Sequence, residues 1–494
     1  MNIYQTTVRN YLVDPTVQGC IFQDLHVVNA NLKAEINNRI CEYLLELRDE
    51  LQIIIETDYA DPVYRDSYYH LYSSKLRAYS KNCIRLSFFE PSFSNVNEFI
   101  AKDANSIKKD YLGFLIVRPI KRCIGRNAIA VEAKKTPNNE IEICKAKIKS
   151  TCSGHKLEIK AFPHSSQDAE HMSCAENSAW TLLEYFGNKY AVYDPILPSQ
   201  IIDSLQDSMY ERLIPTDGLN YIHLSYVLKQ SGFETKIYDS NNPDFFRDKF
   251  ACYIESGLPL LVGVLGKNFA HAIVCIGRER KDNINFKFEP VKLVNGSTKE
   301  LSIWNKCVNK FVVNDDNFPI YRTIDFAKPA EGYPIADPNS CYISHFIVPF
   351  HGEIHVTAEI AESWSMSVLS FINVDNHRII RTFLTSSRSY REYIVGNPDI
   401  SSSIKQSMLK IEMPKFVWLT EILIPKTADA PMRAEGVILL DATGNTRSTC
   451  NCFENVIFAM YKGLIYLYDS NNDCLDNATV TGPNNFEMFK GNLK

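Results

Sequence analysis

The sequence lacks the features that mark membrane, secreted and nucleic-acid-binding proteins. No stretch approaches the run of about 18 apolar residues that a membrane-spanning helix requires. The first residues, MNIYQTTVRNYLVDP, contain no basic region followed by an apolar run, so we expect no signal peptide. The formal charge of -5 on 494 residues is too small to favour nucleic acid as a partner. These absences predict a cytosolic, cytoplasmic protein with no membrane and no nucleic-acid partner.

A disulfide framework and a cofactor motif are also missing. The 14 cysteines are scattered along the chain, and a reducing compartment would keep them as free thiols. Cys450 and Cys452 form the only close pair, and a C-x-C without a second pair or a nearby histidine is weak evidence for zinc. No G-x-x-x-x-G-K-[ST] phosphate-binding loop is present. We therefore expect neither a metal nor another cofactor.

What the chain does contain is the composition of a globular protein, with 45% hydrophobic and 22% charged residues. Its length suggests roughly two to four domains. The order of helical and strand-like patterns divides it into residues 1–157, an α/β accessory domain, residues 158–328, and residues 329–494, a C-terminal α/β region of unknown role. The chemistry-bearing residues gather in the middle segment.

Hydrophobic spacing predicts the elements of the two outer segments. A helical pattern covers Asn31 to Ile55, where apolar residues recur at helical spacing. Strand-like runs follow at Ile84 to Phe89, Tyr111 to Pro119 and Ala128 to Ala133. The last segment alternates helices at Ala358 to Ile372 and Arg388 to Val395 with the strand-like runs FVWLTEILI, GVILLDATG and VIFAMYKGLIYLYD.

The middle segment reads as helices followed by strands. Short helices are expected at Pro198 to Asp207 and Gly218 to Gly232, then a strand at Phe233 to Asp239 and a helix at Pro243 to Glu255. LPLLVGVL and AHAIVCIG flank a turn-forming triplet, Gly266 to Asn268, and predict a hairpin whose second strand begins at His271. The segment is thus of the α+β class, with a helix packed on an antiparallel sheet.

The stretch SQDAEHMSCAENSAWTLLEYFG places Cys174 at a helix start. Ser173 and Glu176 fit the capping box S-x-x-E, and a dense apolar face follows before Gly187 ends the helix. Free N–H groups and the positive end of the helix dipole stabilise a thiolate in the first turn. Cys174 is either a nucleophile or a packed small hydrophobe, and the rest of the chain decides between the two.

A nucleophilic cysteine needs a histidine and usually a group that orients the ring. Of the 11 histidines, His271 is the candidate, because it stands at the mouth of a buried strand. The strand Phe311 to Asn314 ends in Asp315 and Asp316, and strand alternation puts only one of them on the side of the ring. We choose Asp315, while both acids also fit the start of an ordinary loop.

Gln167 lies shortly before the cysteine, where its side-chain amide can join the Cys174 backbone N–H in an oxyanion hole. This order of residues resembles the papain-like cysteine peptidases, and most closely their bacteriocin-processing, double-glycine peptidase-like branch. The matching pieces are Gln167, the helix from Cys174 through EYFG, AHAIVCIG and VVNDD, over roughly a third of the chain. The resemblance implies Cys174 as nucleophile, His271 as general base and acid, Asp315 as orienting residue and Gln167 as oxyanion donor.

The sequence departs from that branch in three places. Gln167 stands one residue further from the cysteine, Ala175 replaces a glycine, and Asp316 replaces a proline. The segments YLGFLIVRPI, WLTEILIP and LLDATG are similar to parts of uncharacterised bacterial proteins, for which no function is known. The favoured function is a cofactor-independent cysteine peptidase that acts on a protein or peptide substrate. The large flanking domains indicate either restricted access to the site or the docking of a dedicated protein partner. Alternatives are a transglutaminase, a deamidase or another acyl-transfer enzyme, and an inactive peptide-binding scaffold.

Overall fold

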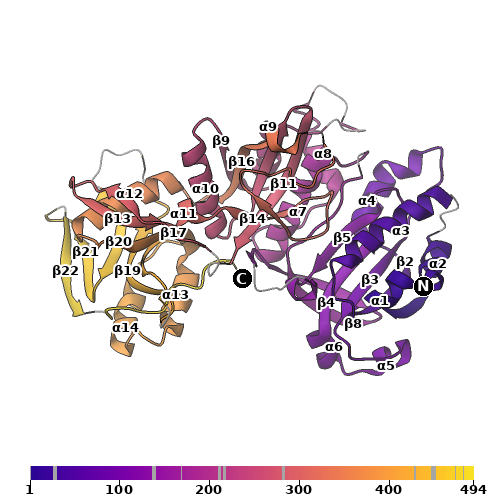
Figure 1. The fold of residues 1–494 in the computed structure, drawn as a ribbon, viewed down its shortest axis with the longest axis horizontal. Coiled ribbons are helices and arrows are strands. Elements are labelled where there is room, and N and C mark those ends of the chain that lie inside the picture. The colour runs from indigo at the N-terminus through magenta and orange to yellow at the C-terminus, as the bar shows by residue number, and fades with distance from the viewer. Residues whose placement is uncertain are drawn as a thin grey trace. The chain divides into compact units, whose positions relative to one another are not determined.

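The structure is a computed structural model that describes most of the chain. The described residues are 2–25, 30–135, 141–168, 170–209, 213–214, 218–280, 284–335, 337–427, 430–444, 446, 452–472, 474–481 and 483–493. Cys450, half of the close cysteine pair, lies outside them. With 32% helix and 33% strand in largely antiparallel sheets, the fold is of the α+β class (Figure 1). Within these ranges, no helix is both long and apolar enough to cross a bilayer.

Residue contacts divide the chain into two compact units. The first comprises residues 1–237, 259–276 and 312–347, and the second comprises residues 238–258, 277–311 and 348–494. The sequence-based division at residues 157 and 328 assumed that each domain is one continuous stretch, which these units are not. Most boundaries between the units fall within strands of the middle segment, so the chain passes from one unit to the other several times.

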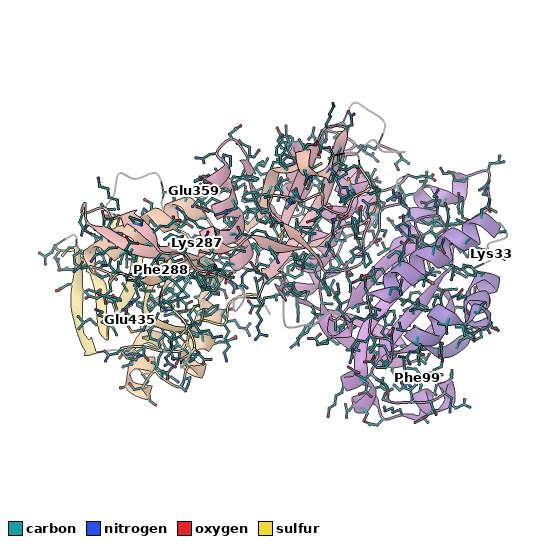
Figure 2. The ribbon with its side chains drawn as sticks, in the orientation of Figure 1. Lys33, Phe99, Lys287, Phe288, Glu359 and Glu435 are labelled. Carbon is teal, nitrogen blue, oxygen red and sulfur yellow. The ribbon has the colours of Figure 1, made fainter. Side chains whose placement is uncertain are left out.

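The first unit opens with a five-stranded antiparallel sheet in the order β1-β2-β3-β4-β5. Its strands are β1 (Ile3–Thr7), β2 (Gln52–Tyr59), β3 (Cys83–Phe89), β4 (Tyr111–Val117) and β5 (Ile124–Ile129). The helices around it are α1 (Val8–Val13), α2 (Pro15–Asp24), α3 (Ala30–Leu45), α4 (Pro62–His70), α5 (Val96–Ala101) and α6 (Ala104–Asp110). Phe99 of α5, labelled in Figure 2, packs on Phe89 and Phe93 in this part of the core.

The predicted helix Asn31 to Ile55 is wrong in its second half. Helix α3 ends at Leu45, and Ile53, Ile54 and Ile55 belong to β2, where they are buried. Three β-branched residues in a row favour a strand that is covered on both faces, and this local preference outweighs the helical spacing. The strands predicted at Ile84 and at Tyr111 are confirmed, whereas β5 begins earlier than Ala128 and ends at Ile129.

The rest of the first unit combines helices with a seven-stranded sheet. The helices are α7 (Cys174–Lys189), α8 (Pro198–Leu205) and α9 (Tyr221–Gln230). The sheet runs β15-β14-β11-β10-β16-β9, and β6 pairs with β11. Its strands are β6 (Ile141–Ile143), β9 (Phe233–Asp239), β10 (Leu260–Gly266), β11 (Phe269–Glu279), β14 (Lys310–Asn314), β15 (Arg322–Asp325) and β16 (Tyr342–His351). A separate hairpin joins β7 (Ala146–Cys152) and β8 (His155–Ala161).

The second unit is built on an eight-stranded sheet in the order β12-β13-β17-β18-β19-β20-β21-β22. Its strands are β12 (Glu289–Lys292), β13 (Thr298–Ile303), β17 (Arg378–Ser386), β18 (Phe416–Ile424), β19 (Arg433–Asp441), β20 (Val456–Tyr461), β21 (Leu464–Asp469) and β22 (Cys474–Thr481). Its helices are α10 (Pro243–Glu255), α11 (Trp304–Cys307), α12 (Ala358–Phe371), α13 (Ser387–Gly396) and α14 (Ser402–Lys410). The helices and strands predicted for the C-terminal segment are present, but the strand at GVILLDATG spans Arg433–Asp441, and VIFAMYKGLIYLYD forms two strands, β20 and β21.

Several predicted boundaries in the middle segment need correction. Helix α8 ends at Leu205, and α9 spans Tyr221–Gln230 within the predicted Gly218 to Gly232. Gly187 does not end its helix, since α7 continues to Lys189. A Cβ at Gly187 would lie 2.6 Å from the Pro195 nitrogen, so the glycine permits close approach of the returning chain. The predicted hairpin is confirmed as the antiparallel pair β10 and β11, but β11 begins at Phe269. His271 is therefore the third residue of the strand.

Candidate active site

Helix α7 starts at Cys174, as its capping residues predict. The Ser173 backbone N–H donates to Glu176 Oε2 at 3.1 Å, and the Ser173 hydroxyl donates to the same oxygen. This capping box fixes the first turn of the helix. Cys174, the first helical residue, is half-buried and in the reduced form. It therefore stands at the positive end of the helix.

The loop that leads to Cys174 is held by hydrogen bonds from several elements. Asn177 Nδ2, one turn into the helix, donates to the Ser165 carbonyl at 2.7 Å. Arg118 Nη2 donates to the Ser166 carbonyl at 2.8 Å. Asp168 Oδ1 accepts three backbone N–H groups of the following turn, at 2.8 to 3.0 Å. These hydrogen bonds connect the residues before Cys174 to the helix and to Arg118.

Helix α7 runs along β11, and this brings the cysteine to the histidine. Ser178 Oγ donates to the Ala272 carbonyl of β11 at 3.1 Å. Cys174 lies four residues before Ser178, on the same helix face and one turn nearer the helix start. The Cys174 side chain is hydrogen-bonded to His271, the strand residue before Ala272. The two predicted partners, far apart in sequence, are thus in contact.

The acids at the end of β14 face the same histidine, because β14 neighbours β11 in the sheet. Asp315 Oδ1 lies 3.0 Å from His271 Nε2, and Asp316 Oδ1 lies 3.5 Å from it. Asp315, the acid we chose, is the nearer of the two. The prediction that only one acid points at the ring is wrong, because β14 ends at Asn314 and strand alternation does not extend to the two acids. With Nε2 directed at Asp315, Nδ1 is the ring nitrogen available to the Cys174 thiol.

The protonation of the histidine follows from its neighbours. Burial alone would lower the pKa of His271, but hydrogen bonds with Asp315 and Cys174 and the charges of both acids raise the pKa to about 10. The ring therefore carries two protons at neutral pH. An imidazolium beside a sulfur favours the thiolate, and this ion pair is the form in which a catalytic cysteine attacks.

The two acids differ in their proton affinity. Burial would raise the pKa of Asp315, but the hydrogen bond and charge of His271, the Tyr333 hydroxyl and the Arg322 charge hold the pKa below its usual value. Burial raises the pKa of Asp316 to about 7, with the Asp315 charge acting in the same direction and the His271 charge against it. Asp315 is therefore the acid that stays ionised.

Two partners of Asp315 were not anticipated from the sequence. The Tyr333 hydroxyl lies 2.7 Å from Asp315 Oδ1 and 2.6 Å from Oδ2, and the Tyr333 ring packs on the His271 ring with centroids 5.5 Å apart. Arg322 Nη1 donates to Asp315 Oδ2 at 2.8 Å. Tyr333 covers the His271–Asp315 hydrogen bond. No spacing rule could have found either residue, because both follow β14 in segments that carry no motif.

Gln167 is close to the site, but the contact that the structure gives it is made by its main chain. Its backbone N–H hydrogen-bonds to the Asp316 carboxylate, and the residue is half-buried. Among the described residues, the structure gives no contact between the Gln167 side-chain amide and Cys174. The assignment of Gln167 as oxyanion donor therefore stays a prediction. His164, set aside in the sequence, is fully buried and its Nε2 lies 3.2 Å from the Asp315 carbonyl oxygen. Burial lowers the pKa of His164 to about 4, so it is a neutral structural residue.

The same three residues also have the composition of a divalent-cation site. His271, Asp315 and Asp316 each offer one ligand atom, and these three atoms lie within 4.8 Å of one another. The donor set argues against such a site. Both Asp315 oxygens already accept hydrogen bonds, from His271, Tyr333 and Arg322. A cation at Asp315 would meet the Arg322 guanidinium at 2.8 Å from the same oxygen. The arrangement is that of a buried hydrogen-bond network with a thiol at its end.

Compared with models of known protein families and with curated proteins, the sequence matches none of them. The class of the site is therefore defined by its own geometry. A thiol at a helix start, an imidazole on the adjacent strand and a buried carboxylate behind the ring are the parts that nucleophilic acyl transfer requires.

Proposed function

We propose that this protein is a papain-like cysteine peptidase that cleaves a peptide bond in a protein or peptide. The observation that carries the proposal is the chain of contacts from Cys174 at the first residue of α7 to His271, and from His271 Nε2 to Asp315 Oδ1 at 3.0 Å. The packing of α7 along β11 of an antiparallel sheet supports the papain-like architecture.

In this reaction the Cys174 thiolate attacks the scissile carbonyl carbon and forms a C–S bond. The carbonyl electron pair moves to oxygen, where the Cys174 backbone N–H at the start of α7 stabilises the negative charge. The pair returns as the C–N bond breaks, and the leaving nitrogen takes the proton of His271. Water then attacks the thioester while His271 accepts its proton, and departure of the sulfur restores the thiolate.

The test is labelling by a peptidyl electrophile that reacts irreversibly with active-site thiols, followed by intact mass measurement. We expect a single adduct on the wild-type protein and none on Cys174→Ala. Cys307→Ala is the matched control, because Cys307 is also a free, half-buried thiol and lies in the other unit. An adduct that persists in Cys174→Ala and disappears in Cys307→Ala would contradict the proposal.

The products separate this function from the others that the same residues serve. Incubation with a peptide mixture, with and without an added primary amine, is followed by mass spectrometry. Chain cleavage supports the peptidase. Amine incorporation at glutamine identifies a transglutaminase, and conversion of a side-chain amide to an acid identifies a deamidase. Binding of peptide without any product identifies a scaffold.

A further inference from the structure

Asp316, which follows β14, contacts both His271 and the loop that leads to Cys174. It is 5% exposed. Its Oδ1 lies 3.5 Å from His271 Nε2 and accepts a hydrogen bond from Asn317 Nδ2 at 3.1 Å. The Gln167 backbone N–H also donates to this carboxylate. One side chain thus touches both the histidine ring and the chain seven residues before Cys174.

The second oxygen of Asp316 has a different environment. Asp316 Oδ2 is buried and has no hydrogen-bond partner in the described part of the chain. Asp316 lines a pocket of about 30 Å³, together with Ser166, Asn317 and Arg122. A buried carboxylate oxygen that accepts no hydrogen bond is a site where a proton can bind.

The charges around Asp316 come from several elements. His271 of β11 and Asp315 lie on one side, and Arg122, which donates to Asn317 Oδ1 at 3.0 Å, lies on the other. On the α3 side of the pocket, Arg39 and Glu42 pair with each other at 3.3 Å. Burial raises the pKa of Asp316 to about 7 against the lowering effects of His271, Arg122 and the Gln167 N–H.

We propose that Asp316 is a positioning residue of the Cys174–His271 pair, and that uptake and release of a proton by its carboxyl group sets how firmly His271 holds its own proton. When Asp316 is neutral, one carboxylate faces the imidazolium. When it ionises, a second negative charge stands 3.5 Å from Nε2 and stabilises the doubly protonated ring further. The inference rests on the proposed function, in which Cys174 is the reactive thiol.

The experiment compares two reagents of similar size and different charge. Rates of Cys174 alkylation by iodoacetate and by iodoacetamide are measured from pH 5 to about 11, and their ratio is taken. An imidazolium beside the sulfur accelerates the anionic reagent, whereas an ionised Asp316 slows it. We expect two inflections in the wild-type ratio, one near pH 7 from Asp316 and one near pH 10 from His271.

Asp316→Asn is the decisive variant, because it keeps the shape of the side chain and removes its charge. The lower inflection disappears, and the upper one moves down by about one to three pH units, as expected when one opposite charge within about 4 Å is lost. Arg122→Gln keeps Asp316 and removes a charge that favours its ionised form, so the lower inflection moves to higher pH. This second variant decides the question if Asp316→Asn does not fold.

Glu42→Gln is the matched control, since Glu42 lines the same pocket without contacting His271; both inflections stay in place. An Asp316→Asn profile identical to that of the wild type, with Cys174 still labelled, overturns the inference and leaves the proposed function standing. If neither reagent labels Cys174 in the wild-type protein, the proposed function is overturned, and the inference with it.

Discussion

Asp315 divides its two oxygens between His271 and Arg322. Oδ1 lies 3.0 Å from His271 Nε2, and Oδ2 lies 2.8 Å from Arg322 Nη1, while the carboxylate as a whole is 1% exposed. One buried acid therefore balances two cations at neutral pH. Such a group orients the ring and also holds the fold, and the two roles can be separated by substitution.

Replacement of Asp315 by Ala should slow alkylation of Cys174 at pH 7 by about 10²-fold, because the ring loses its orienting acceptor. It should also lower the free energy of unfolding by about 1.5–3 kcal/mol, since Arg322 and Tyr333 lose the charged acceptor of their hydrogen bonds. Alkylation kinetics and urea unfolding measure the two effects. Asp316→Ala, measured alongside, should slow alkylation less, and the reverse order would identify Asp316 as the orienting acid.

Tyr333→Phe tests the contribution of the Tyr333 hydroxyl to the His271–Asp315 hydrogen bond. The variant keeps the ring that packs on His271 but removes the hydroxyl that donates to both Asp315 oxygens. We expect a loss of about 1–2 kcal/mol in unfolding free energy, as for a hydrogen bond to a charged group. Without this donor the proton affinity of Asp315 rises, so the carboxylate accepts the hydrogen bond of the imidazolium more strongly. The iodoacetate-to-iodoacetamide ratio should then fall at a higher pH than in the wild type, and an unchanged profile would restrict Tyr333 to packing.

Cys174 should be the most reactive thiol of the chain at neutral pH. Burial raises the pKa of several of the other thiols, including Cys83, Cys123 and Cys252, so these remain protonated. Cys174 is half-buried and faces an imidazolium. Limited iodoacetamide labelling with peptide mapping measures the order of reaction. Modification of another cysteine before Cys174 would remove the basis of the nucleophile assignment.

His271→Ala should abolish this preference for Cys174 and leave the fold intact, because the thiol loses the charge that stabilises its anion. A second readout is stability. The pKa of His271 is raised in the folded protein to about 10, above its ordinary value. Its contribution to stability is therefore complete below about pH 6.5 and is lost as the pH rises through 10. Urea unfolding at pH 6 and pH 9 should show a larger loss for the wild type than for His271→Ala.

The parts of this site that were predictable from sequence are those set by local rules. Ser173 and Glu176 define the helix start, and the Gly266 to Asn268 turn defines the hairpin. Each depends on residues within a few positions of one another. The juxtaposition of Cys174 with His271 came instead from resemblance, because no local rule pairs residues so far apart.

The remaining features depend on tertiary contacts that leave no local pattern. Tyr333 and Arg322 reach Asp315 from segments after the strand, and nothing in their spacing indicates this. The helical reading of Ile53 to Ile55 failed because apolar residues at helical spacing also occur in a strand covered on both faces. The alternation of the chain between two units is likewise a property of contacts rather than of composition.

Gly187 provides a test of packing that is independent of catalysis. It lies inside α7, where alanine would ordinarily be favoured, but an added Cβ would stand 2.6 Å from the Pro195 nitrogen and 2.9 Å from the Asp194 carbonyl carbon. These neighbours are backbone and cannot move aside without shifting the chain. We expect Gly187→Ala to lower the free energy of unfolding by about 1–3 kcal/mol, the usual cost of overpacking.

Gly19 is the matched control for this substitution, because it lies in helix α2, is exposed, and has nothing within 4 Å of an added Cβ. Gly19→Ala should raise the free energy of unfolding by about 0.5–1 kcal/mol, since alanine loses less backbone entropy in a helix. The two variants therefore shift the urea midpoint in opposite directions. A stabilised Gly187→Ala would mean that the chain at Pro195 does not pack on α7, and the placement of Cys174 at the end of that helix would need revision.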